Sequence, residues 1–278
     1  MRETFNKIRS PLKWAGGKFR VLEQIKKRLP DGSRLIEPFA GSSVVFLNTD
    51  FKHYTLSDSN HDLIRFYKLL KKDGAGFIDY CRKYFGPKYN NATEYYKIRD
   101  KFNSTNDTIL KSALFLYINK HGYNGLCRYN ASGKLNVPFG RYKKPYFPEN
   151  ELLLFSKKSK KATIKCEDFE KIINKATPED VIYCDPPYVP RNRTSYFTSY
   201  SAVGFNEDEQ IRLANAVKKA ADSGVSVLVS NHSNNITKNI YSEATHKYHF
   251  NVRRVISCNG NKRELARELL ALYLPSNK

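Results

Sequence analysis

The chain has 278 residues, with 48 Lys and Arg against 27 Asp and Glu and a formal net charge of +21. A hydrophobic fraction of 40%, with 13% aromatic residues, excludes a disordered chain, because such a composition can bury enough apolar surface to offset the entropy of ordering. So large a positive charge is typical of proteins that bind a polyanion, and nucleic acid is the first candidate.

Membrane insertion and metal binding find no support in the sequence. No apolar run approaches the roughly 20 residues of a membrane helix, and the polar first ten residues lack the apolar core of a signal peptide, so we expect a cytoplasmic protein. The five cysteines are scattered and never spaced C-x-x-C, which predicts free thiols rather than a disulfide framework or a zinc site. The six histidines form no H-x-E or H-E-x-x-H pair, so we expect no metal centre.

Helices and strands alternate at both ends of the chain. The first part predicts a helix over residues 19–29, ended by Pro30-Asp31-Gly32, then a strand over 34–37, a helix over 42–48 and a strand over 53–57. The last part predicts strands over residues 163–166, 181–184 and 225–229, helices over 169–176 and 206–221, and closing strands over 248–256 and 269–274. This alternation predicts an α/β fold with a mostly parallel sheet.

The middle of the chain has a different pattern. Helices are predicted over residues 62–71, 93–102 and 109–120, followed by a stretch rich in Gly, Asn and Tyr. No acidic residue occurs between Asp107 and Glu149, and Asn130-Ala131-Ser132-Gly133 is a plausible turn, so we expect a basic β-hairpin at about residues 121–144. We therefore predict a core domain of residues 1–60 and 149–278 with an inserted domain of residues 61–148.

The most specific motif is Asp185-Pro186-Pro187-Tyr188, directly after the strand over residues 181–184. In α/β proteins ligands bind at the carboxyl ends of the strands. A carboxylate and a backbone carbonyl can accept two hydrogen bonds from an exocyclic amino group, which makes its nitrogen more nucleophilic, while Tyr188 can stack on the base. The prolines stiffen the loop, so this geometry costs little to order.

Two further motifs predict a cofactor site. Glu37-Pro38-Phe39-Ala40-Gly41 is a tight strand-to-helix turn in which Gly41 lets a ligand approach the backbone. Asp58 ends the next strand, where an acidic residue binds a ribose diol in Rossmann-like units, although it could equally cap the following helix. Trp14, beside Gly16-Gly17-Lys18, suits a nucleoside that carries a carboxylate.

In this order, the motifs resemble the Dam-type DNA adenine N6-methyltransferases of the α group, and the resemblance covers nearly the whole chain. It implies a Rossmann-like methyltransferase core that binds S-adenosylmethionine, with an inserted helical and β-hairpin domain that recognises double-stranded DNA. The cofactor-binding residues that it implies are Trp14, Lys18, Glu37, Phe39, Gly41, Asp58 and Asp185. The implied catalytic residues are Asp185, Pro186 and Tyr188, which would bind the amino group of an adenine flipped out of the duplex.

The same resemblance assigns DNA contacts to the hairpin and to Lys13. It implies that Tyr123 and Asn124 lie near the orphaned thymine, that Leu126 contacts a thymine methyl group and that Arg128 recognises a guanine. Lys13 would contact another guanine and Arg141 a phosphate, with Tyr142 beside it. Together these contacts imply methylation of adenine in GATC by an enzyme that acts as a monomer.

The chain departs from the family pattern at Ser43, where many relatives have glycine. Arg191 and Arg193 lie in a loop whose role we do not assign, and His232 is expected to be a hydrogen-bonded histidine at a strand end. Three alternatives stay open: an N4-cytosine DNA methyltransferase, whose tetrad usually begins with Ser, an RNA or protein N-methyltransferase, and a DNA-binding regulator without catalytic activity.

Overall fold

The computed structural model describes residues 7–188, 205–253 and 265–275. A seven-stranded sheet with the order β3-β2-β1-β4-β5-β7-β6 forms its centre. The first five strands of this order are parallel, whereas β7 pairs antiparallel with both β5 and β6. The strands are β1 (Arg34–Glu37), β2 (His53–Ser57), β3 (Ala162–Lys165), β4 (Asp180–Cys184), β5 (Ser226–His232), β6 (His246–Arg253) and β7 (Leu265–Tyr273). The predicted α/β fold is therefore confirmed.

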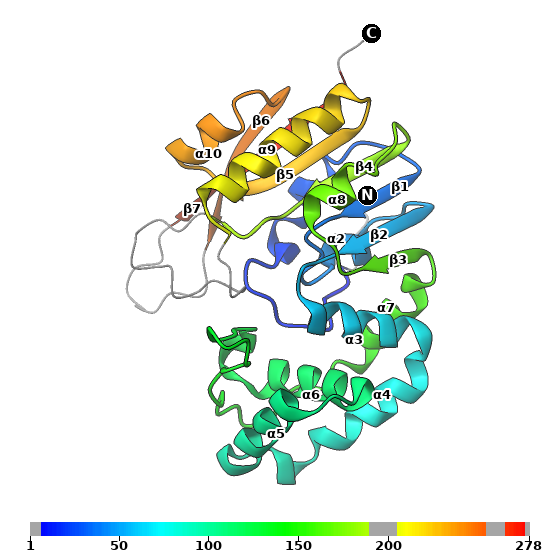
Figure 1. Cartoon of the computed structure of the whole chain (residues 1–278), viewed down its shortest axis with the longest axis vertical. Coiled ribbons are helices and arrows are strands. Elements are labelled where there is room, and N and C mark those ends of the chain that lie inside the picture. Colours follow the sequence, from blue (N-terminus) through cyan, green and yellow to red (C-terminus); the bar gives the residue numbers. More distant parts are fainter. Residues whose placement is uncertain (1–6, 189–204, 254–264, 276–278) are drawn as a thin grey trace, which may run out of the picture.

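Helices cover the sheet and extend away from it (Figure 1). Those around the sheet are η1 (Lys18–Arg20), α1 (Leu22–Lys26), α2 (Val44–Asn48), α8 (Phe169–Ile173), α9 (Glu207–Asp222) and α10 (Asn235–Ile240). Those between β2 and β3 are α3 (His61–Lys72), α4 (Gly74–Arg82), η2 (Lys83–Phe85), η3 (Pro87–Tyr89), α5 (Ala92–Ser104), α6 (Thr108–His121), η4 (Tyr123–Gly125) and α7 (Glu149–Ser159). In Figure 1, α4, α5 and α6 form a separate layer below the sheet, with α3 between them and the sheet.

The central strands are buried because helices lie on both faces of a parallel sheet. All five residues of β4 and the last three of β1 are buried. At the amino ends of these strands, Arg34 Nε donates to Asp180 Oδ1 at 2.8 Å and Nη2 donates to Oδ2 at 2.6 Å. This two-bond contact matches the β1–β4 register, in which Arg34 faces Asp180, and so aligns the carboxyl ends of both strands.

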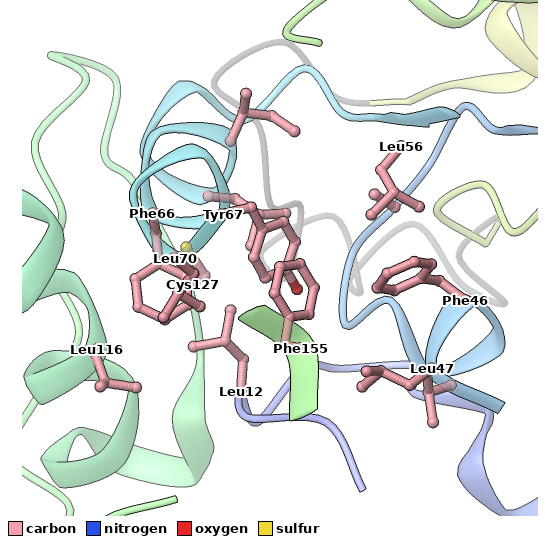
Figure 2. Close-up of a cluster of buried hydrophobic side chains, with 14 of the residues drawn as sticks. Leu12, Phe46, Leu47, Leu56, Phe66, Tyr67, Leu70, Leu116, Cys127 and Phe155 are labelled. Atoms are coloured by element: carbon pink, nitrogen blue, oxygen red, sulfur yellow. The ribbon is translucent and has the colours of Figure 1, made fainter. Parts of the chain in front are cut away.

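One hydrophobic cluster joins the sheet to the helices between β2 and β3. Figure 2 shows side chains from α2, α3, α6 and α7 packed together with Leu12. The rings of Tyr67 and Phe155 stack with centroids 4.4 Å apart, and Phe46 meets Phe155 edge-on at 5.5 Å. Shared burial of this kind holds the two parts in a fixed relation. The domain boundaries at residues 60 and 149 stay a prediction.

Three sequence expectations need correction in detail. The helix expected over residues 19–29 is shorter and begins as a 3₁₀ turn, because Val21, with φ −102° and ψ 6°, interrupts it. Sequence analysis did not predict α4 and α10, and of α7 it identified only the lysine-rich end. The hairpin at residues 121–144 has two isolated antiparallel bridges, Gly122 with Phe139 and Tyr129 with Leu135, rather than two continuous strands.

Candidate active site

The carboxyl ends of four neighbouring strands place polar side chains at one edge of the sheet. Glu37 ends β1, Asp58 follows β2, Asp185 follows β4, and Ser230 lies near the end of β5. Because β2, β1, β4 and β5 are parallel neighbours, these groups lie along a single edge. The structure thus brings together the tetrad and both acidic residues that the sequence singled out.

Asp185 is held by two donors. Lys18 Nζ lies 2.7 Å from Asp185 Oδ1, and Ser230 Oγ donates to the same oxygen at 2.9 Å. Burial raises the pKa of Asp185, while the charge of Lys18 and both hydrogen bonds oppose that rise. Within the described residues both bonds end on Oδ1 and none on Oδ2, which leaves Oδ2 to accept a hydrogen bond from a substrate.

Lys18 itself is almost fully buried, with 5% of its surface exposed. Its Nζ also donates to Gly16 O at 2.8 Å and lies 4.5 Å from the centre of the Tyr188 ring. The sequence predicted Lys18 as a cofactor contact, and the structure places it against the tetrad. One ammonium group therefore joins the Gly16-Gly17 turn to Asp185 and Tyr188.

Tyr188 is anchored at its hydroxyl. The hydroxyl donates to Glu268 Oε2 at 2.8 Å, and the ring meets that of His232 edge-on, with centroids 4.1 Å apart. Burial opposes ionisation of Glu268, but hydrogen bonds from His232 and Tyr188 and the charge of Lys18 lower its pKa overall. His232 is thus a hydrogen-bonded strand-end residue, as expected, and it also lies against the tetrad.

The turn after β1 is held on three sides at Gly41. Its N–H donates to Asp58 Oδ2 at 3.0 Å, and its carbonyl accepts from the Tyr67 hydroxyl at 2.7 Å. A Cβ built on Gly41 would lie 3.0 Å from Trp14 Nε1, and its φ is +44°. Both the space and the backbone conformation require glycine here.

The capping alternative for Asp58 is wrong. Asn60 caps α3, since its side chain accepts from the backbone N–H groups of Asp62 and Leu63. Asp58 instead accepts from the N–H groups of Gly41 and Asn60. Its carboxylate is therefore fixed beside the glycine turn, where a ribose diol is expected.

Glu37 is buried without a complete set of partners. It is 2% exposed, and among the described residues its Oε1 has no hydrogen-bond partner. Burial raises its pKa to about 8, against a hydrogen bond from the Phe46 backbone. An unpaired buried acceptor costs free energy, so Glu37 fits a ligand that donates to it.

Three aromatic side chains pack together near the glycine turn. The ring of Phe39 stacks on Phe169 with centroids 5.2 Å apart, and Phe205 meets Phe39 at 5.6 Å and Phe169 at 5.8 Å. Sequence analysis identified Phe39 but missed the other two. The Asp168-Phe169 pair was the available signal, because it begins α8 shortly after the end of β3, the parallel neighbour of β2.

The amino-terminal motif is tied to the helical part of the chain. The Lys13 N–H donates to Asn119 Oδ1 at 2.9 Å, and Asn119 Nδ2 donates to the Lys13 carbonyl at 2.7 Å. A Cβ on Gly125, whose φ is +63°, would lie only 2.2 Å from Lys13 Cβ. Lys13 and residues 121–144 are therefore packed against one another.

The expected DNA-contacting residues near Lys13 lie on one surface and are partly exposed. Tyr123 is 51% exposed, and Asn124 N–H donates to the Tyr142 hydroxyl at 3.0 Å. The Lys13 ammonium lies 3.8 Å from the centre of the Tyr142 ring. Lys13, Asn124 and Tyr142 thus share one surface, as a common duplex contact requires.

Arg128 makes its contacts within the hairpin. Its Nε donates to Asn136 Oδ1 at 2.9 Å, and its Nη2 donates to the Asn136 carbonyl at 3.2 Å. Leu126 is half-buried against the core, whereas Arg141 is exposed, with a φ of +53°. These bonds use two of the five N–H donors of the guanidinium, so the other donors can contact a guanine while Asn136 holds the side chain.

Some expectations lie outside the described residues, namely Arg191 and Arg193 and the rest of the loop after the tetrad. Within the described ranges, no group of three or more His, Cys, Asp and Glu side chains could hold a metal ion. No helix of that part of the chain is long and apolar enough to cross a membrane.

Comparison with known proteins gives a consistent result. The model of the D12 class N6 adenine-specific DNA methyltransferases matches residues 14–256. The chain is 47% identical over 270 residues to the DNA adenine methylase of Vibrio cholerae serotype O1, covering 97% of each chain. It is 46% identical over 270 residues to the DNA adenine methylase of Escherichia coli K12, covering 97% of this chain and 96% of that one. A solved structure, precorrin 8W decarboxylase from Methanobacterium thermoautotrophicum, covers 90% of this chain and 87% of its own, with 9% identity and a TM-score of 0.37, too low to support an argument.

Proposed function

The chain belongs to the D12 class of N6 adenine-specific DNA methyltransferases, and on this premise we propose that it transfers the methyl group of S-adenosylmethionine to adenine N6 in double-stranded GATC. DNA adenine methylation follows from the family; the donor, the target sequence and the residue roles are the proposal. The observation that carries it is the set of contacts around Asp185, in which Lys18 and Ser230 occupy Oδ1 and no other described residue bonds to Oδ2, the oxygen we assign to the incoming amino group.

The residues beside the glycine turn fit S-adenosylmethionine. Glu37 Oε1 is a buried acceptor without a donor among the residues that the structure describes, which matches the ammonium group of the cofactor. Asp58 is fixed beside Gly41 and matches the ribose hydroxyls, while Phe39 and Trp14 line the same turn. When bound, S-adenosylmethionine supplies a sulfonium methyl group for direct displacement.

The tetrad supplies the groups that orient the target base. Asp185 Oδ2 and the Pro186 carbonyl accept the two N6 hydrogens, which localises the nitrogen lone pair on N6, and Tyr188 stacks on the ring. The base must leave the duplex to reach this buried edge, at a cost of roughly a few kcal/mol. The methylated N6 carries a positive charge and releases its spare proton to solvent, which leaves neutral N6-methyladenine and the neutral thioether S-adenosylhomocysteine.

Sequence recognition is assigned to the hairpin and Lys13. An Arg contact to guanine O6 and N7 is the commonest specific pairing in the major groove, and we assign it to the half-buried Arg128, whose guanidinium is oriented by Asn136. Leu126 contacts the thymine methyl group, Tyr123 and Asn124 lie at the gap left by the flipped base, and Arg141 binds a phosphate.

The proposal is tested by cofactor binding and product identification. Labelled S-adenosylmethionine is titrated into the wild-type protein and into Asp58→Asn, with the exposed Asp50→Asn as control. We expect affinity to fall about tenfold in Asp58→Asn only, because a hydrogen bond to a charged group contributes about 1.5–3 kcal/mol. Transfer to duplex DNA followed by nucleoside digestion should yield N6-methyladenine; N4-methylcytosine, or no cofactor binding by the wild type, would contradict the proposal.

A further inference from the structure

Three consecutive residues at the end of β5 each support a different group of the tetrad. Ser230 supports Asp185 directly, since its Oγ donates to Oδ1 at 2.9 Å. Ser230 Oγ also accepts from the Tyr183 hydroxyl at 3.1 Å, and only 2% of Ser230 is exposed. The first member of the tetrad is therefore fixed from inside the sheet.

Asn231 supports Pro187 through Gln210 of α9. Asn231 Nδ2 and the Tyr241 hydroxyl both donate to Gln210 Oε1, at 3.0 Å and 2.9 Å. Gln210 Nε2 in turn donates to the Pro187 carbonyl at 2.7 Å. Because Gln210 and Asn231 are fully buried, no water competes for these bonds. The Pro187 carbonyl is held by the protein, which distinguishes it from the Pro186 carbonyl assigned to the base.

His232 supports Tyr188 through Glu268. These two residues face each other in the antiparallel pairing of β5 with β7. His232 Nδ1 lies 3.4 Å from Glu268 Oε1, and Glu268 Oε2 accepts from the Tyr188 hydroxyl at 2.8 Å. The two carboxylate oxygens thus connect a rigid strand pair to the aromatic ring of the tetrad.

We propose that the end of β5 is the frame that fixes the shape of the tetrad, and that Glu268 is the positioning residue through which this frame holds Tyr188. Glu268 meets Tyr188 at its hydroxyl, the end of the side chain remote from the backbone, so its effect on the base passes through the tyrosine. The inference rests on the proposed role of residues 185–188 in binding the flipped adenine.

The physical reason is the sensitivity of stacking and in-line transfer to small displacements. A Tyr ring fixed only at its backbone can swing about two side-chain torsions, whereas a ring bonded at its hydroxyl is held at both ends. Misplacing reacting groups by about 1 Å can cost on the order of 10²-fold in rate. Supporting hydrogen bonds of this kind are what keep a site in its productive geometry.

A different role for Glu268 must be separated from this one. Its negative charge also acts on Lys18 and Asp185, so removing it could disturb the ion pair rather than Tyr188. The two roles predict different behaviour for an amide: Glu268→Gln keeps an oxygen that can accept from Tyr188 but loses the charge. Glu268→Leu loses both while keeping most of the volume.

The test is a double-mutant cycle with Tyr188→Phe, Glu268→Leu and the combined variant. Single-turnover methyl transfer is measured on a GATC duplex at saturating S-adenosylmethionine, together with cofactor affinity and thermal unfolding. We expect Tyr188→Phe and Glu268→Leu each to slow transfer about tenfold, as loss of a charge-assisted hydrogen bond implies, and the double variant to be no slower than either. Cofactor affinity should stay within about twofold of wild type, and Glu268→Gln should recover most of the rate.

A matched control is Glu243→Gln, since Glu243 is an exposed carboxylate that pairs with Lys218 at 3.0 Å. Its transfer rate should equal that of wild type. Additive losses in the cycle, or a Glu268→Gln variant as slow as Glu268→Leu, would overturn the positioning role in favour of a charge effect. A wild-type rate in Tyr188→Phe would also overturn it, and this variant removes only a hydroxyl, so folding is not at issue.

Failure of the proposed function would give a different result from failure of the positioning role of Glu268. If the wild-type protein transfers no methyl group to the GATC duplex, or if Asp185→Ala transfers at the wild-type rate, the assignment of the tetrad is wrong. If the wild type is active and Asp185→Ala is not, the result of the cycle bears on Glu268 alone.

Discussion

The catalytic edge and the recognition segment of residues 121–144 are built on different kinds of backbone. At the edge, Asp185 and Tyr188 are bonded to Lys18, Ser230 and Glu268, which are distant in sequence. In the recognition segment, Arg128 is bonded to Asn136 eight positions away, and the described backbone has only isolated bridges. The chemistry is thus built on paired strands, whereas the DNA contacts are built on irregular backbone that is itself tied to α3 through Tyr129 and Asp62 and to α5 through Leu135 and Asn103.

The two regions differ because methyl transfer needs preorganised side chains and recognition needs side chains that reach the DNA. Methyl transfer requires atoms to be placed accurately before the reaction, so its residues take their partners from the packed sheet. Recognition requires side chains that reach the bases, so this segment carries exposed residues such as Tyr123 on a backbone fixed by its contacts to the helices. Lys13 connects the catalytic edge to the recognition segment, since it lies in the same amino-terminal motif as Lys18 and packs on Gly125.

The largest expected effect breaks the catalytic edge alone. Asp185→Ala removes the acceptor for N6 and leaves Lys18 without its partner, so we expect single-turnover transfer to fall by about 10²–10³-fold or more. Affinity for a GATC duplex should stay within a few fold, because the recognition segment is unchanged. Quench-flow transfer and fluorescence anisotropy measure the two quantities, and an equal loss in both would contradict the separation.

Breaking the connection between the two regions should have the next largest effect. Both Gly125 and Gly133 have positive φ, at +63° and +70°, but an added Cβ contacts Lys13 at 2.2 Å only at Gly125 and nothing within 4 Å at Gly133. We expect Gly125→Ala to lower the free energy of unfolding by about 2 kcal/mol more than Gly133→Ala, since overpacking typically costs 1–3 kcal/mol. Urea unfolding of both variants checks this, and equal losses would mean that Lys13 does not pack on the segment.

The recognition segment itself can be tested at Arg128. Arg128→Ala should reduce discrimination at one guanine by about 1–3 kcal/mol, with little change in transfer at saturating DNA. Comparing binding to duplexes altered at each guanine in turn gives the position. If preference at both guanines is unchanged, Arg128 does not contact a base, and its bonds to Asn136 are only structural.

The smallest expected effect concerns Glu37 and pH. Its folded pKa of about 8 lies above the usual 4.5, so the folded protein keeps a proton that the unfolded chain releases between these values. The stability from this proton is fully present below pH 4.5 and is lost as pH rises through 8. Glu37→Gln cannot titrate, so its free energy of unfolding relative to wild type should rise by more than about 1 kcal/mol from pH 5 to pH 8. A pH-independent difference would mean that Glu37 is ionised in the fold.

Much of the edge was predictable from sequence because parallel strands end in polar residues there. Asp58 and Asp185 each follow a short apolar run, which places them at one edge once the strands pair. Ser230-Asn231-His232 was recognised as a strand end without a role for Ser230, and Glu268 was missed, because the importance of both residues depends on which strands are neighbours. A single acidic residue beside the apolar run at residues 269–273 was the only signal for Glu268.

The recognition segment was predicted less accurately in its backbone than in its residues. The turn at Asn130-Ala131-Ser132-Gly133 and the antiparallel arrangement were expected, but continuous strands were not found. Helix α4 was not predicted because it begins with glycines. Most of α7 was not predicted because its lysine-rich end interrupts the apolar pattern. Ser43 adopts φ 53°, which explains in physical terms why glycine would suit that position.

Comparing two duplexes that differ in one base pair, GATC and GTTC, tests whether catalysis and recognition are carried by different residues. Methyl transfer from labelled S-adenosylmethionine is followed for the wild type, Asp185→Ala and Arg128→Ala. For the wild type we expect N6-methyladenine in the GATC duplex and not in the GTTC duplex. In the GATC duplex we expect almost none with Asp185→Ala, and nearly wild-type transfer at saturating DNA with Arg128→Ala. Equal labelling of both duplexes by the wild type, or a rate loss in Arg128→Ala as large as in Asp185→Ala, would contradict the separation of chemistry from recognition.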